Sequence, residues 1–139
     1  NPAADKEHHT FTYSIFPHQG SWKDAGTVNQ AYLLNNPLEA AVKENEGGTL
    51  PDAYSFVTCS QDNVVVEVVK KAEDEEAVIV RLYECFNRRT DVSLVFAEDI
   101  KSVCECDMLE ADMDEWMPDG RKVSFRMKPF EIKTLKLRF

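Results

Sequence analysis

Apolar and polar residues alternate along most of the chain, and this pattern predicts β-strands. The runs are rich in Val, Ile, Phe and Tyr and are separated by short polar turns. About seven strands after residue 54 predict an all-β chain, an antiparallel β-sandwich with one short helix near the N-terminus. The predicted strands cover residues 55–59, 64–70, 77–86, 92–96, 103–107, 123–127 and 130–139, and an earlier strand covers residues 11–16.

The short helix is predicted between a capping signal and a stop signal. Ser21 can act as the N-cap, with Asp24 three residues later as a capping-box-like partner. Asn36-Pro37 ends the helix, because a residue that precedes proline disfavours the helical backbone. Apolar residues at helical spacing then predict one buried stripe, made of Trp22, Ala25, Val28, Ala31 and Tyr32.

Three further segments are assigned from local composition. Residues 72–76, AEDEE, join two strong strands and predict a hairpin tip, with a metal site as the alternative. Residues 43–52 contain Gly47-Gly48 and predict a loop. The apolar phase of the last strand shifts around Thr134, which predicts a β-bulge there.

Length and charge limit the domain organisation and the partners. The 139 residues predict one domain over residues 10–139, and the polar residues 1–9, which lack an initial Met, are interpreted as a linker or a cut end. A formal net charge of −9 makes nucleic acid a poor partner. A membrane partner is not expected either, because no apolar run approaches the roughly 20 residues of a spanning helix.

The chain has four cysteines, at positions 59, 85, 104 and 106. Cys104 and Cys106 are two residues apart in a predicted strand, so they share a face and cannot easily bond to each other. The spacing also lacks the paired Cys-x-x-Cys pattern of a zinc site. We therefore predict four reduced thiols, no bound metal and a reducing, cytoplasmic location.

No self-contained active site is recognisable in the sequence. A Gly-rich phosphate loop and a Gly-x-Ser-x-Gly elbow are both missing. Acidic residues are so abundant that their number gives no reason to select a catalytic pair. An independent carbohydrate-binding β-sandwich is an alternative interpretation. Its best aromatic candidate is Trp116, in the predicted loop DEWMPDG, although that ring could equally cover a sheet end.

Four segments of the sequence, taken together and in order, resemble one enzyme family. They are FTYSIFPHQGSWKDAG, QAYLLNNPL, VVVEVVKKAEDEEAVIVRLYE and KPFEIKTLKL. Together they resemble the C-terminal part of the α-mannosidases of glycoside hydrolase family 38, in the branch with cytosolic, vacuolar and bacterial enzymes. The resemblance extends from Thr10 to Leu137.

The resemblance implies a parent function but places catalysis elsewhere. The family's enzymes are retaining α-mannosidases whose zinc ion, aspartate nucleophile and acid/base lie in an N-terminal catalytic domain. None of those motifs matches a position in this chain, so no catalytic residue and no metal ligand is assigned here, and the isolated chain is predicted to be inactive. The implied role is that of a C-terminal β-sandwich domain that buttresses the catalytic domain, with possible homo-oligomer contacts. Mannose-containing oligosaccharides are the implied substrates of the parent.

The resemblance also suggests one candidate site, at the corner Pro17-His18-Gln19-Gly20. In this family a loop of the C-terminal region can approach the sugar site. His18 and Gln19 are the candidate substrate-binding residues, in the parent enzyme only, and the alternative is that they merely satisfy backbone groups of a turn. Arg81 and Glu84 of the segment RLYE are expected to pair across the sheet instead.

Overall fold

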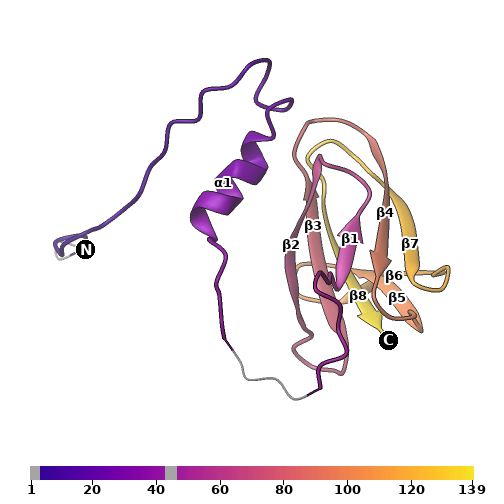
Figure 1. Ribbon diagram of the computed structural model, residues 1–139. Coiled ribbons are helices and arrows are strands. Elements are labelled where there is room, and N and C mark those ends of the chain that lie inside the picture. The colour runs from indigo at the N-terminus through magenta and orange to yellow at the C-terminus, as the bar shows by residue number, and fades with distance from the viewer. Residues whose placement is uncertain (1–3, 43–46) are drawn as a thin grey trace. The chain divides into compact units, whose positions relative to one another are not determined.

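The computed structural model describes residues 4–42 and 47–139. The chain divides into two compact units, Asn1–Gly47 and Gly48–Phe139, which Figure 1 shows in indigo to purple and in magenta to yellow. The first unit holds the only helix among the described residues, and the second holds all of the described strands. A single domain over residues 10–139 with a linker before it stays a prediction, and residues 1–3 and 43–46 of the predicted linker and loop lie outside the described residues.

The first unit contradicts the predicted early strand. Residues 11–16 are extended, but they pair with no strand in the part of the chain that the structure describes. The side chains of Phe11, Tyr13 and Ile15 are 80%, 80% and 85% exposed. The prediction rested on alternation alone, whereas a strand also requires a neighbour that pairs with its backbone groups.

The helix α1 spans Thr27–Asn35, so it begins later than predicted. The capping signal is real but local: Ser21 Oγ lies 2.6 Å from the Asp24 carboxylate, and a turn closes between them. Gly26 then takes a left-handed backbone (φ 64°) and separates this turn from α1. The predicted buried stripe is wrong, because no residue of α1 is buried and Trp22, before the helix, is 43% exposed.

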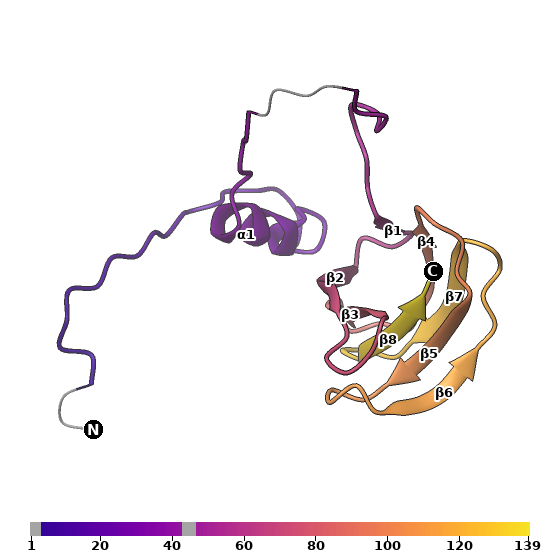
Figure 2. The same ribbon diagram turned by 90° about the horizontal axis from the view of Figure 1, so that it is seen from below.

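The second unit is a sandwich of two antiparallel sheets, as predicted. One sheet has the order β1-β4-β7, formed by Val57–Cys59, Thr90–Phe96 and Lys122–Met127. The other has the order β2-β3-β8-β5-β6. Its strands are Val64–Lys71, Val78–Glu84, Ile132–Arg138, Ser102–Cys106 and Asp112–Trp116. The view in Figure 2 shows the two sheets as separate layers, with β8 in the middle of the larger sheet.

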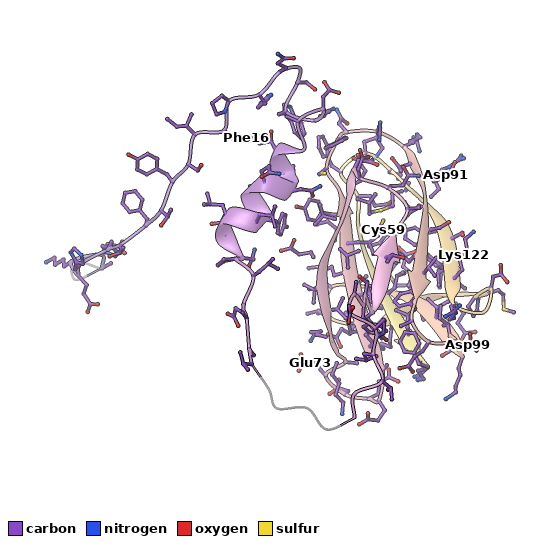
Figure 3. All side chains as sticks on the ribbon, viewed as in Figure 1. Phe16, Cys59, Glu73, Asp91, Asp99 and Lys122 are labelled. Atoms are coloured by element: carbon purple, nitrogen blue, oxygen red, sulfur yellow. The ribbon has the colours of Figure 1, made fainter. Side chains whose placement is uncertain are left out.

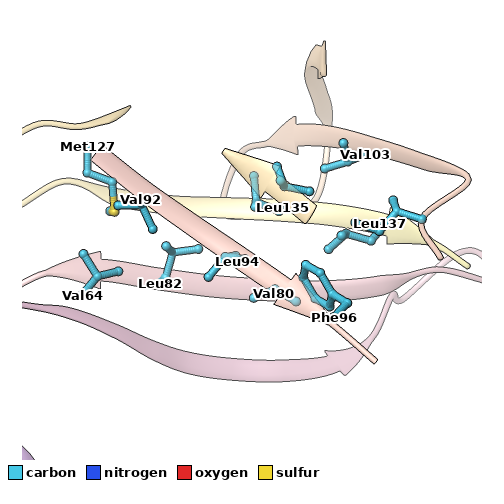
Figure 4. Packing of buried hydrophobic residues seen from close by; sticks show 12 residues of the cluster. Val64, Val80, Leu82, Val92, Leu94, Phe96, Val103, Met127, Leu135 and Leu137 are labelled. Carbon is cyan, nitrogen blue, oxygen red and sulfur yellow. The ribbon is translucent and has the colours of Figure 1, made fainter. Parts of the chain in front are cut away.

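The core lies between the two sheets and is built from alternate residues of their strands. Figure 4 shows Val80 and Leu82 of β3 facing Val92, Leu94 and Phe96 of β4 across the interior. Leu135 and Leu137 of β8 complete the same cluster, and both are fully buried. Because side chains alternate across a strand, the intervening residues of β3 and β8 face away from this core. That outer face is where most of the buried polar groups of β8 lie.

The structure corrects two predictions at the strand level. The segment Asp112–Trp116, with sequence DMDEW, was not predicted as a strand, yet it forms edge strand β6 beside β5. Strand β8 contains no bulge at Thr134, because its register against both β3 and β5 is unbroken. Four successive residues of β8 are buried because it lies in the middle of the five-stranded sheet and both of its faces are covered.

Both edges of the larger sheet carry the irregularities that β8 lacks. The β2–β3 register shifts around Glu67, and the β5–β6 register shifts around Met113. Bulges of this kind, together with the acidic residues of β6, discourage an edge strand from pairing with another chain. The β2–β3 pairing also confirms the predicted hairpin tip at residues 72–76, which the Ala72 N to Ala77 O hydrogen bond closes at 2.8 Å.

Candidate functional site

The structure places His18 and Gln19 at an exposed corner of the first unit. Pro17 leads into the corner, and Gly20 continues it with a left-handed backbone (φ 73°) that glycine adopts without strain. The His18 ring lies 5.6 Å from the Phe16 ring, and Nδ1 of His18 lies 3.3 Å from the Gln19 carbonyl oxygen. Both side chains are therefore exposed to solvent within the first unit, and the predicted strand that leads into the corner pairs with no other strand among the described residues.

Trp116 is not the exposed loop aromatic that a sugar-binding site would need. It is the last residue of β6, is half-buried, and its ring packs against Phe125 of β7 at 5.2 Å between centroids. Lys133 Nζ lies 5.5 Å from the same ring and 2.7 Å from the Glu105 carboxylate. The ring therefore closes the side of the sandwich between β6 and β7, and the carbohydrate-binding alternative loses its strongest candidate.

A hollow of about 500 Å³ opens in the second unit beside the last residues of the chain. Its apolar lining includes Phe56, Val78 and Phe139. The cations at its margin are already paired: Lys70 with Glu110, Lys71 with Glu76, and Arg138 with Glu75. A carbohydrate site needs polar groups that are free to bind hydroxyls, so this hollow offers little to a sugar.

All four cysteines are free thiols. Cys104 and Cys106 pair in register with Lys136 and Thr134 of β8, on the face of the sheet that points away from the main core. Burial raises the pKa of each thiol, and that of Cys106 rises to about 11. Protonated thiols of this kind react slowly, so thiol chemistry is suppressed while the sandwich is closed.

Glu84 is the polar residue that sequence reasoning placed least well. Arg81 does pair across the sheet, since its Nε donates to Thr134 Oγ1 at 3.2 Å. Glu84 instead turns its carboxylate into the end of the sandwich, and the residue is only 1% exposed. It accepts hydrogen bonds from the backbone N–H groups of Phe86, Arg88 and Phe130 at 2.7, 3.3 and 3.0 Å. The Asn63 amide donates to it as well, at 2.7 Å.

This carboxylate joins two loops that are far apart in the sequence. Burial alone would raise the pKa of Glu84, but the donors from Phe130, Asn63, Phe86 and Arg88 outweigh it and hold the pKa below its ordinary value. Asn63 also donates to Thr90 Oγ1 at 2.7 Å, so the network reaches the start of β4. The only sequence signal of this network was a single glutamate, Glu84, at the end of an apolar strand. The role of the network is structural.

A second polar cluster covers the outer face of the five-stranded sheet and was also missed. Lys136 has an 8% exposed side chain, and its Nζ lies 2.8 Å from Glu75 and 2.7 Å from Asp112. Hydrogen bonds to Asp112 and Glu75 raise the pKa of Lys136, and the pKa values of both carboxyls are lowered in return. The hairpin-tip residue Glu75 therefore serves as an ion-pair partner, which the local sequence could not reveal.

The described residues do not assemble a metal centre or a catalytic constellation. Over residues 4–42 and 47–139, no three His, Cys, Asp or Glu side chains gather closely enough to hold a metal ion. The zinc that the family resemblance implies thus finds no fitting ligand set in the described part of this chain, and no chemical step is assigned to it here. Among the described residues, no helix has the length and apolar character needed to cross a membrane.

The fold and these sites define a structural β-sandwich, stabilised by buried polar networks, with an N-terminal segment whose apolar side chains are exposed. Comparison with known families agrees with this class. The profile of the "Glycosyl hydrolases family 38 C-terminal beta sandwich domain" matches residues 63–135, which is more than half of the chain. The chain belongs to this family.

Its relatives are much longer proteins. The chain is 32% identical to Alpha-mannosidase G of Dictyostelium discoideum over 136 residues, which is 95% of this chain and 12% of that protein. It is 36% identical to Alpha-mannosidase 2C1 of Homo sapiens over 145 residues, 96% of this chain and 13% of that protein. An Alpha-mannosidase of Saccharomyces cerevisiae is 25% identical over 158 residues, 98% of this chain and 14% of that protein. The chain thus spans about an eighth of the length of these relatives.

Proposed function

We propose that this chain is the non-catalytic C-terminal domain of a retaining α-mannosidase and that it buttresses the catalytic part of the parent enzyme. The family membership of the β-sandwich and the relatives named as α-mannosidases support the parent activity. The parent would remove terminal α-mannose residues from oligosaccharides. Its zinc ion would be held by residues outside this chain, and a cytoplasmic location fits the four free thiols.

The exposed apolar stripe of the first unit is the observation that carries the buttressing role. Phe11, Tyr13 and Ile15 occur at every second position of an extended segment, so their side chains share one face. The rings of Phe11 and Tyr13 lie 6.4 Å apart between centroids, in keeping with that shared face. An exposed stripe of this composition and spacing is suited to join the edge of a sheet, and the remainder of the longer parent is its proposed partner.

Comparing one substitution in two settings tests the docking. We expect Ile15→Ser to change the free energy of unfolding of the isolated 139-residue chain by less than about 0.5 kcal/mol, because Ile15 is 85% exposed there. In the full-length parent the same substitution should lower stability by about 2 kcal/mol, since a large apolar side chain would then leave a buried site. Thermal or chemical denaturation measures both values.

Ser14→Ala, on the opposite face of the segment, is the matched control and should be neutral in both settings. Equal effects of Ile15→Ser in the isolated chain and in the parent would contradict docking. The isolated chain should also fail to hydrolyse p-nitrophenyl α-mannoside, with or without added zinc. Turnover by chain purified away from any host mannosidase would contradict the non-catalytic assignment.

The exposed corner supports a second, finer part of the proposal: His18 and Gln19 would contact the sugar, or the catalytic domain beside it, in the parent. We expect His18→Ala in the full-length enzyme to lower kcat/KM by about tenfold, because a lost hydrogen bond to a charged or strongly polarised group has about this effect. The melting temperature should stay nearly unchanged, since His18 makes few contacts within its own unit. Unchanged kinetics, or a loss of activity that follows a loss of stability, would assign His18 to the turn alone.

A further inference from the structure

The connection between β5 and β6 does not point away from the sheet, as an ordinary hairpin loop would. Residues 107–111 instead reach across the outer face of the five-stranded sheet toward the β2–β3 hairpin. The Met108 carbonyl oxygen accepts a hydrogen bond from Arg81 of β3 at 3.3 Å, and Met108 Sδ lies 4.0 Å from Thr134 Oγ1 of β8. The loop therefore crosses β8 and β3, two strands beyond the one that it leaves.

The far end of this loop is fastened by one carboxylate. Glu110 lies 2.8 Å from Lys70 Nζ of β2 and accepts a hydrogen bond from the Glu73 backbone N–H at 3.0 Å. Its side chain is only 11% exposed, although it belongs to a surface loop. Hydrogen bonds from Lys70 and from the Glu73 N–H lower the pKa of Glu110, so it is charged at neutral pH. Glu73 marks this hairpin in Figure 3, at the opposite end of the sandwich from Asp91.

Hydrogen bonds within the loop link its two ends. The Asp107 carboxylate accepts hydrogen bonds from the backbone N–H groups of Leu109 and Ala111 at 2.8 and 2.9 Å. Asp107 and Ala111 also bond through their backbones, at 3.0 Å, where the loop begins and ends. Glu110 itself takes a left-handed backbone (φ 67°), which is unfavourable for a residue with a side chain and is compensated by its two fastening contacts.

A small second core lies under this face of the sheet. Cys106 packs with Ala72, Ala77 and Ile79, and it is only 4% exposed. Its Sγ lies 3.7 Å from the Thr134 carbonyl oxygen, beside the point that Met108 covers. Cys59, Cys85 and Cys104 are only half-buried and do not belong to this cluster. The loop therefore lies next to the buried thiol of Cys106, with Thr134 of β8 between them.

We propose that residues 107–111 form a latch over the outer face of the sheet. The Glu110 carboxylate, which we call the catch, holds the latch on the β2–β3 hairpin. Opening of the latch, without unfolding of the sandwich, exposes the Cys106 thiol. Alkylation of Cys106 by a small electrophile such as a maleimide then reports the open latch. The alkylation adds the cysteine sulfur across the maleimide double bond, and the thiol proton ends on the neighbouring carbon, so no oxidant is required. This inference concerns the sandwich itself and does not depend on the parent's activity.

Pulse labelling of the native 139-residue chain with N-ethylmaleimide, followed by peptide mass spectrometry, measures each thiol separately. We expect Glu110→Gln to raise the labelling rate of Cys106 by about tenfold, because a charge-assisted catch is lost and the latch spends more time open. The rates of Cys59 and Cys85 should stay unchanged, since neither lies under the latch. Glu76→Gln is the matched control: Glu76 pairs with Lys71 at the same hairpin but not with the latch, and it should leave all four rates unchanged.

Two outcomes would overturn the latch. One is a Cys106 rate in Glu110→Gln equal to that of the unmodified chain. The other is a parallel rise for all four thiols, which would show that the thiol becomes accessible only by global unfolding. Lys70→Met provides an independent variant if Glu110→Gln folds poorly, because it removes the cationic side of the catch and leaves the loop sequence intact. It should raise the Cys106 rate selectively as well, and equal rates would again contradict the latch.

Discussion

Replacing Glu84 by alanine is expected to lower the free energy of unfolding of the sandwich by about 3–4 kcal/mol. The carboxylate is 1% exposed and receives three backbone N–H groups and the Asn63 amide. Alanine would leave these donors without their acceptor inside the protein, and unpaired buried donors cost far more than an exposed charge contributes. Urea denaturation at neutral pH, followed by the fluorescence of Trp22 and Trp116, measures the change.

Two further variants separate the carboxylate from mere side-chain volume. Glu84→Gln keeps the shape but presents an amide where donors converge, so it should cost less than Glu84→Ala and more than a surface change. Glu98→Ala, at an exposed bend, should stay within about 0.5 kcal/mol of the unmodified chain. A Glu84→Ala chain as stable as the Glu98→Ala chain would show that the network contributes nothing.

The same residue gives a direction for the pH dependence. The folded pKa of Glu84 lies below its ordinary value of 4.5, so the folded state favours the charged form. The stabilisation that results is present above pH 4.5 and is lost as the pH falls through the folded pKa. Asp112 and Glu75 act with the same sign, because both pKa values are lowered. Glu84→Gln should therefore lose less stability than the unmodified chain when the pH is lowered from 6 toward 3.

Leu135→Ala is expected to have the other large effect, a loss of about 3 kcal/mol or more in the free energy of unfolding. Leu135 is fully buried in β8 and lies in the main cluster between the two sheets (Figure 4). Alanine removes the transfer free energy of the lost methyl and methylene groups and leaves a cavity that rigid strands on both sides cannot fill. Chemical denaturation of the isolated chain measures the loss.

Leu109→Ala is the matched control for this substitution. Leu109 is 88% exposed on the loop between β5 and β6, so the same chemical change should cost less than about 0.5 kcal/mol. Similar losses for the two variants would contradict the placement of the core between the sheets. The comparison also tests which leucines of the chain are buried, since Leu135 lies within a strand and Leu109 lies in the loop that follows one.

The sequence on its own was sufficient for most strands of the second unit, with β6 as the exception. β2, β3 and β4 alternate clearly and are rich in β-branched residues, so each was predicted within a few residues of its observed bounds. Hairpin connections are also local, and the tip at residues 72–76 follows from two strong strands joined by five residues, most of them acidic. Family membership was readable for the same reason, because it depends on the order and spacing of residues.

Only the tertiary structure decided which segments find a neighbour. Residues 11–16 have the alternation of a strand but no pairing strand among the described residues, whereas DMDEW lacks that alternation and becomes β6 because β5 offers it an edge. Glu84 and Lys136 both depend on partners 21 to 61 positions away in the sequence. The partners of Glu84 include Asn63 and Phe130. Those of Lys136 are Glu75 and Asp112. A local sequence pattern sets the backbone preference of a segment. Its burial and its strand pairing depend on the neighbouring segments, which come together only when the chain folds.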